Sequence, residues 1–136
     1  MDKDLQQQLI RNLNQMFAIT VESRRIINKI VNETHSPWMI TASLNLNISI
    51  NYLKGFYHYT QLSTDEIDAV EVVDTDNVQD YLMLFGSCLG DVIQIYETNN
   101  FQSLIAEKNW NPVLTELLIG FYHNVFEAKC TIELQI

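Results

Sequence analysis

Long apolar runs, targeting segments and familiar catalytic motifs are all missing from this sequence of 136 residues. No apolar run approaches the roughly 20 residues that cross a bilayer. The first eight residues, Met-Asp-Lys-Asp-Leu-Gln-Gln-Gln, are polar and mixed in charge, unlike a signal peptide. There is no phosphate loop, GxGxxG, HExxH, CxxC or GxSxG. We therefore expect a cytoplasmic protein that is not an enzyme and that carries no cofactor and no metal.

Cysteine is scarce as well. Cys88 and Cys130 are the only two, and they lack the close spacing of a redox or metal-binding pair. Isolated cysteines of this kind most often behave as small buried hydrophobic residues. The sequence thus favours a structural role for both thiols over a redox or metal role.

Positive charge is missing from the middle of the chain, where no Lys or Arg occurs between Lys54 and Lys108. The net charge is −9. Residues 1–54 hold six Lys and Arg against four Asp and Glu, a balance of +2, whereas residues 55–136 hold two against thirteen, a balance of −11. Such a field repels nucleic acid phosphates and anionic membranes, so we expect neither as a partner. It attracts a basic protein.

The clearest periodic signal predicts a helix from Asp76 to Glu97, which we interpret as the central helix of the core, with Asp74 or Asp76 as its N-cap. Gly86 and Gly90 lie one turn apart within it, and each costs roughly 1 kcal/mol relative to Ala. Two such costs predict a flat strip on which another backbone packs closely. The apolar residues recur at intervals of three and four: Val78, Tyr81, Leu82, Phe85, Leu89, Val92, Ile93 and Tyr96.

Two further helices are predicted from their apolar spacing. The first runs from about Asp4 to Val31, with a break near Ile19–Ser23 where Thr20 or Ser23 would cap a second segment. The other begins at Asn111-Pro112, with Asn111 as N-cap and Pro112 at the first helical position.

Between these helices the period changes to two. Apolar residues alternate with polar ones from Ile40 to Tyr52, which indicates a strand with one buried face. Lys54-Gly55 then predicts a hairpin turn, and the alternating tail Cys130–Ile136 adds a third strand. The predicted fold is α+β: a two-layer single domain of residues 1–136, with helices packed on a small antiparallel sheet.

An all-α bundle is the alternative, because Ser36-Pro37 could open a helix with Pro37 at its first position. The sequence leaves open whether residues 39–61 form a hairpin or a helix.

Seven acidic residues lie from Asp65 to Asp80 with no positive charge among them, and we call them the acidic run. A solvated linker and helix face is the simpler explanation. The functional one is a docking surface for a basic protein, in which aligned charge speeds association and excludes wrong partners. Aromatic anchors could come from Trp38, Trp110, Tyr57 and Tyr59. The predicted partner-binding residues are Asp65, Glu66, Asp68, Glu71, Asp74 and Asp76.

The three histidines, His35, His58 and His123, stand far apart in the sequence. His58 and His123 are the pair that a fold could bring together with carboxylates into a metal or catalytic site. Both lie in a tetrapeptide, Gly-Phe-Tyr-His, that occurs at Gly55–His58 and again at Gly120–His123. The flanking residues align poorly, so we interpret the repeat as coincidence.

Three functions follow in order of preference. The first is a non-enzymatic module that binds and neutralises a basic partner, as a bacterial immunity protein does with a nuclease-type toxin. The second is a secretion chaperone for an effector protein, which would display apolar grooves instead of an acidic surface. The third is a small enzyme or metal-binding protein with a site near His58 and His123. The oligomeric state stays open, with a homodimer among the options.

Overall fold

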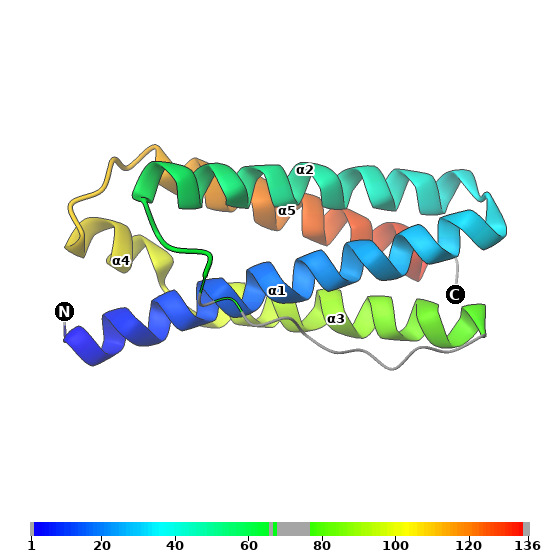
Figure 1. Cartoon of the computed structure of the whole chain (residues 1–136), viewed down its shortest axis with the longest axis horizontal. Helices are drawn as coiled ribbons and strands as arrows, with labels where there is room; N and C mark the ends of the chain where they lie inside the picture. The colour runs from blue at the N-terminus through cyan, green and yellow to red at the C-terminus, as the bar shows by residue number, and fades with distance from the viewer. Residues whose placement is uncertain (1, 66, 68–76, 135–136) are drawn as a thin grey trace.

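The computed structural model describes residues 2–65, 67 and 77–134, and every regular element in these ranges is a helix. Four of the five helices are long, and they lie side by side along one axis (Figure 1). α1 and α5 run in one direction, and α2 and α3 in the other. The helices are α1 (Lys3–Thr34), α2 (Pro37–Thr60), α3 (Val78–Thr98), α4 (Phe101–Glu107) and α5 (Leu114–Glu133).

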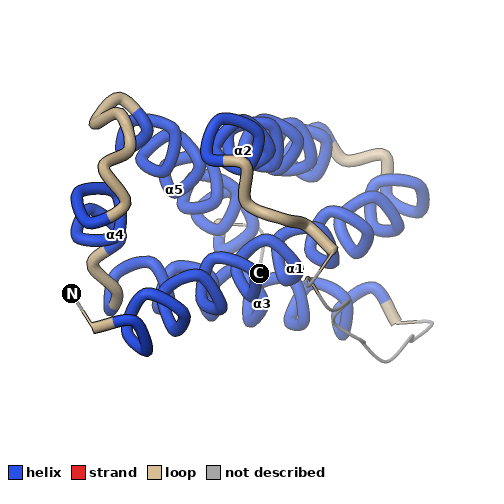
Figure 2. The backbone as a smooth tube through the Cα atoms, turned by 60° about the vertical axis from the view of Figure 1, so that its left-hand side comes forward, coloured by secondary structure: helices blue, strands red, loops and turns tan. Residues whose placement is uncertain are grey.

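The long helices form a four-helix bundle. α2 packs most extensively on α5, α1 packs on both α2 and α3, and α3 also packs on α5. The short α4 lies at one end of the bundle, where it joins α3 to α5 (Figure 2). α2 ends and α3 begins at opposite ends of the bundle, so these two helices are parallel. Over the described ranges, no helix combines the length and apolar character that a membrane span requires.

The predicted α+β fold is therefore wrong, and the all-α alternative is correct. Residues 40–52, predicted as a strand, lie in α2, and so does the predicted turn Lys54-Gly55. The predicted C-terminal strand belongs to α5 as far as Glu133, and residues 135–136 lie outside the described part. Period-two alternation arose because α2 is apolar on two faces. Its buried face carries Met39, Ala42, Leu46, Ile50 and Leu53, and its exposed face carries Ile40, Leu44, Ile48 and Tyr52.

Local signals explain where α1 and α2 meet. His35 ends α1 in the left-handed conformation (φ 51°), and its N–H donates to the carbonyl of Val31. Pro37 then occupies the first turn of α2, where its missing N–H costs no hydrogen bond. The predicted break near Ile19–Ser23 is absent from the continuous α1.

Thr20 and Ser23 satisfy their buried hydroxyls within that helix instead of capping a new one. Thr20 Oγ1 donates to the carbonyl of Met16 at 2.7 Å, and Ser23 Oγ to that of Ile19 at 2.8 Å. Side chains of this kind can bond back to the preceding turn without ending a helix.

The helix predicted at 76–97 is confirmed as α3, although it is one of four packed helices and not a central one. Its N-cap is Asn77, whose Oδ1 accepts from the Gln79 N–H at 2.9 Å, in place of the predicted Asp74 or Asp76. The predicted apolar face is buried or half-buried along its length.

The glycine strip of α3 does not receive another backbone, so that prediction is wrong. A Cβ on Gly86 would meet nothing within 4 Å, and one on Gly90 would meet only the Lys129 Cε at 3.7 Å. The close approach occurs at Gly120 of α5, where a Cβ would lie 2.8 Å from ring atoms of Tyr52. Tyr52 of α2 therefore lies directly over the α5 backbone.

The glycine of each copy of the repeated tetrapeptide, Gly55 and Gly120, lies beside a side chain of the opposite helix. Tyr52 precedes Gly55 by three residues and covers Gly120; Leu117 precedes Gly120 by three residues and lies 3.9 Å from the Cβ position of Gly55. Two antiparallel helices thus present the same motif to each other with local two-fold symmetry. The phenylalanines of both copies, Phe56 and Phe121, are fully buried in the shared core.

The core contains one notable polar link. Tyr57 is buried against Phe17, with ring centroids 5.2 Å apart, and its hydroxyl donates to Asn14 Oδ1 at 2.7 Å. Burial raises the pKa of Tyr57 well above its ordinary value of 10.0. Over the described residues, no buried side-chain nitrogen or oxygen lacks a hydrogen-bond partner, as a well-packed interior requires.

The two glycine environments predict different responses to alanine. Gly86→Ala should raise the free energy of unfolding by about 1 kcal/mol, since the methyl group enters open space and the helix gains propensity. Gly120→Ala should show no such gain, because its methyl group displaces the Tyr52 ring. Urea denaturation of both variants measures the difference.

A second background isolates the cause. In Tyr52→Ala protein the ring is gone, so Gly120→Ala should there stabilise by about 1 kcal/mol, as at Gly86. An equal gain from Gly120→Ala with and without Tyr52 would contradict the contact.

Candidate functional site

The structure describes only one of the six predicted partner-binding residues. Asp65 is exposed shortly after α2 ends, and its N–H donates to Ser63 Oγ at 3.1 Å. The others lie outside the described residues: Glu66, Asp68, Glu71, Asp74 and Asp76. Where the chain is described again, α3 continues the negative charge with exposed Asp80, Asp91 and Glu97 and with no Lys or Arg.

The structure keeps His58 and His123 apart. The register fixed by Tyr52 over Gly120 and Leu117 over Gly55 places His58 opposite position 114 of α5, nine residues from His123. Nine residues of helix correspond to about 13 Å along the axis. Both imidazoles are exposed. No cluster of three or more His, Cys, Asp or Glu able to hold a metal occurs within residues 2–65, 67 and 77–134.

Both cysteines are free and half-buried. Burial, together with the nearby carboxylate of Asp91, raises the pKa of the Cys88 thiol above its ordinary value of 9.0. A raised pKa leaves less of the nucleophilic thiolate at neutral pH.

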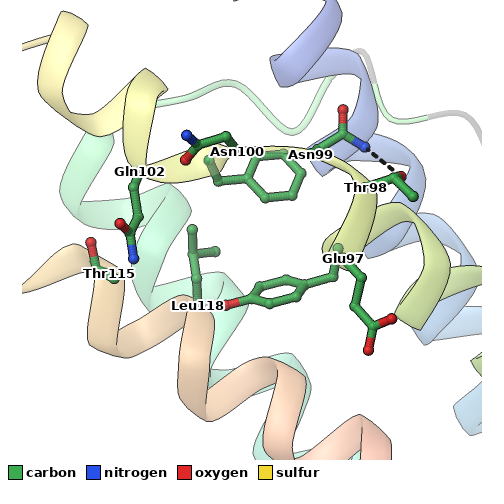
Figure 3. Close-up of a pocket in the computed structure, with 9 residues that line it drawn as sticks. Glu97, Thr98, Asn99, Asn100, Gln102, Thr115 and Leu118 are labelled. Atoms are coloured by element: carbon green, nitrogen blue, oxygen red, sulfur yellow. Dashed lines mark hydrogen bonds between the residues drawn. The ribbon is translucent and has the colours of Figure 1, made fainter.

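A hollow of about 460 Å³ opens where α3, α4 and the start of α5 meet (Figure 3). Its apolar lining residues are Tyr96 and Phe101, whose rings are 6.2 Å apart, and Leu118. The other lining residues carry polar groups, and the side chains of Gln102 and Thr115 lie close together. The remaining lining residues are Glu97, Thr98, Asn99 and Asn100.

Several of these amides already hold the fold together. Asn99 accepts at 2.7 Å from the Asn12 amide of α1 and donates at 2.7 Å to the carbonyl of Ile95. Asn100 caps α4 by accepting from the Ser103 N–H at 3.3 Å. The hollow is thus a hydrogen-bonding surface built from helix ends, without a nucleophile and base in contact among its described lining.

Glu97, which lines this hollow, accepts a hydrogen bond from a tyrosine of α5. The hydroxyl of Tyr122 on α5 donates to Glu97 Oε1 at 2.5 Å, and the Tyr122 ring stacks on Tyr96 at 4.4 Å. The hydrogen bond to the carboxylate, followed by burial, raises the pKa of Tyr122 to about 12. Burial also raises the pKa of Tyr96. The stack joins α3 to α5.

A second hollow, of about 400 Å³, lies at the end of the bundle where α2 ends and is lined mainly by apolar side chains: Tyr59, Trp110, Asn111, Val113, Leu114 and Leu117. Trp110 packs edge-on against Phe56 at 5.9 Å. Tyr59 is 73% exposed and Asp65 follows it by six residues, so this hollow lies close to the start of the acidic run.

The four predicted aromatic anchors therefore differ in their exposure to solvent. Trp38 and Tyr59 are exposed, Trp110 is half-buried, and Tyr57 belongs to the core.

Sequence reasoning missed one surface feature. The exposed side of α2 carries an apolar ridge, which we define as Ile40, Leu44, Ile48 and Tyr52. The alternation from 40 to 52 contained this signal, because those apolar residues surround the whole circumference once the segment is wound as a helix.

Comparison of the chain with protein-family models, with curated proteins and with solved structures finds no match.

The Tyr122–Glu97 hydrogen bond predicts a titration. In protein labelled at the tyrosine Cζ, the Tyr122 NMR signal should titrate near pH 12, and Glu97→Gln should return its pKa toward the ordinary 10. A raised folded-state pKa means that this contribution to stability is complete below pH 10 and is lost as the pH rises through 12. Tyr122→Phe assigns the signal. An unchanged Tyr122 pKa in Glu97→Gln protein would contradict the assignment of the cause.

Proposed function

We propose that this chain is a non-enzymatic protein-binding module of the cytoplasm, whose acidic surface binds and neutralises a basic protein. The observation that supports this most is the charge of α3. Asp80, Asp91 and Glu97 are exposed along its 21 residues, the helix contains no Lys or Arg, and six further acidic residues, from Asp65 to Asp76, precede it in the chain.

The arrangement of charge suits capture of a cation-rich surface. α1 carries most of the positive charge of the chain, whereas α3 contains three acidic residues and no Lys or Arg. Aligned surface charge raises association rates and rejects partners of like charge more than it adds raw affinity. A basic nuclease-type toxin, neutralised as by a bacterial immunity protein, is the partner class that this charge fits.

Aromatic anchors at the start of the acidic run add a second element. Interfaces draw much of their energy from a few aromatic residues set in apolar pockets, with charges at the rim. Tyr59 and Trp110 line the apolar hollow from which the chain leads to Asp65. We propose that the partner inserts an apolar side chain there while its basic residues meet the acidic run.

The chaperone alternative draws on a different observation, namely that apolar residues are exposed on α2 and in the same hollow. A secretion chaperone for an effector would hold an apolar segment on such a surface, and its binding would persist at high salt. Salt dependence therefore separates the two proposals.

The acidic run is tested by removing four of its charges. The Asp65→Asn, Asp68→Asn, Glu71→Gln, Asp74→Asn variant should fold like the parent. Exposed ion pairs contribute about 0.2–1 kcal/mol each, so capture of the basic partner should lose about 1–4 kcal/mol, or roughly fivefold to several hundredfold in affinity. The measurement is affinity capture from the native host's lysate at low salt, salt elution, and titration of the protein identified.

A matched variant controls for total charge. Glu33→Gln, Glu107→Gln, Glu116→Gln and Glu127→Gln also remove four negative charges, at exposed positions of α1, α4 and α5. This control should keep most of the affinity. Equal weakening by both variants, or unchanged affinity in the first, would sink the proposal, and a salt-resistant apolar partner would favour the chaperone.

A further inference from the structure

The hollow where α3, α4 and α5 meet is negatively charged. Among the described residues that line it, Glu97 alone carries a charge, and none is Lys, Arg or His. Over the described ranges Glu97 forms no ion pair, although its Oε1 accepts from the hydroxyl of Tyr122 at 2.5 Å. The end of α3 and the start of α4 adjoin here, so their dipoles offset each other and the carboxylate sets the charge. The hollow therefore disfavours anions and attracts a cation.

The carboxylate of Glu97 is held in place beside aromatic rings. Tyr122, which donates to it, stacks on Tyr96 with ring centroids 4.4 Å apart and an interplanar angle of 21°. The ring of Phe101 follows at 6.2 Å from that of Tyr96, and both of these rings line the hollow. Aromatic faces attract cations, and a carboxylate that is already oriented costs less to engage. Together they select a cation that also carries apolar surface.

Further hydrogen-bond acceptors lie across the hollow from this carboxylate. The side chains of Gln102 and Thr115 make no hydrogen bond among the described residues. Figure 3 shows both on one side of Leu118 and Glu97 on the other. The amide and the hydroxyl each supply an oxygen that accepts hydrogen bonds. A cation that bridges the two sides therefore needs several donors that point in different directions.

A guanidinium group meets these requirements better than other common cations. It is planar, stacks on aromatic rings and carries its N–H donors in a rigid fork, whereas an ammonium is a compact, strongly hydrated point charge. A metal ion would need several ligands of the His, Cys, Asp or Glu kind, and no such cluster occurs in the described part of the chain.

The volume of about 460 Å³ also leaves room for a stem behind the charged group. We propose that the hollow binds a guanidinium group on an apolar stem, and that an arginine side chain of the basic partner supplies it. The identity of this source rests on the proposed function, whereas the guanidinium site itself does not.

Titration of the full chain with Nα-acetyl-arginine amide, followed by NMR, tests the site. The ring signals of Tyr96 and Tyr122 should shift and saturate, because the probe binds beside these rings. The citrulline analogue has nearly the same shape without the charge and should bind about fivefold more weakly. The lysine analogue should also bind more weakly than arginine, since its ammonium neither stacks nor forks. No saturable shift, or equal binding of arginine and citrulline, would overturn the site.

Variants locate the bound probe. Glu97→Gln removes the charge with little change in shape and should weaken binding about fivefold. Because this variant also changes the bond to Tyr122, a second one leaves that bond intact: Gln102→Lys places a cation at the exposed edge of the hollow and should weaken binding by at least as much.

Gln79→Lys is the matched control, since Gln79 is exposed near the start of α3, at the opposite end of the bundle. It should bind the probe like the parent. Circular dichroism checks that all three variants are as helical as the parent. Equal binding by Gln102→Lys and Gln79→Lys would place the probe elsewhere and contradict the site.

Capture of the basic partner distinguishes the two sources of a guanidinium group. If the partner supplies it, Gln102→Lys should weaken capture about fivefold relative to Gln79→Lys, although both variants have the same total charge. Equal capture by these two variants, with the probe still bound by the parent, would make a free guanidinium compound the occupant and overturn the arginine of the partner. The probe needs no partner, so failure of the site is distinguishable from failure of the proposed function.

Discussion

The packing of α2 on α5 is the most extensive in the bundle, and within it the ring of Tyr52 lies directly over the backbone of Gly120. A side chain at position 120 would occupy the place of the ring, so only glycine allows this approach without a shift. The equivalent contact of Leu117 with Gly55 makes the pairing two-sided and sets its register. This register buries Phe56 and Phe121 together, separates His58 from His123, and turns Ile40, Leu44 and Ile48 outward.

The helices with one apolar face were predictable, and the helix with two was not. α1 and α3 separate polar from apolar sides, so their spacing identified them within a few residues. In α2 the second apolar face made the pattern alternate, and an alternating pattern indicates a strand. Pro37 at the start of the segment was the correct local signal, outweighed by the longer one. The second apolar face of α2 is therefore the feature that misled the fold prediction.

Candidate sites were less predictable because they depend on register. The sequence marked Gly86 and Gly90 as places of close approach, but the glycine in close contact is Gly120, against the ring of Tyr52. This contact could not be predicted without knowing which helix packs on α5. Tyr122 and Glu97 are 25 positions apart, and nothing in their spacing pairs them before α3 and α5 are placed side by side. The asymmetry of charge, in contrast, can be predicted without knowing how the helices are aligned. In the structure the acidic residues of α3 are exposed.

The parallel course of α2 and α3 divides the molecule into two helical hairpins, one made of α1 and α2 and the other of α3, α4 and α5. The packing of α1 on α3 and of α2 on α5 lies between these halves. In topological terms the fold is a complex of two hairpins held in one chain, and the covalent link raises the effective concentration of one for the other. A chain divided between residues 67 and 77 interrupts no described helix, so its two fragments retain the complementary surfaces needed to reassemble.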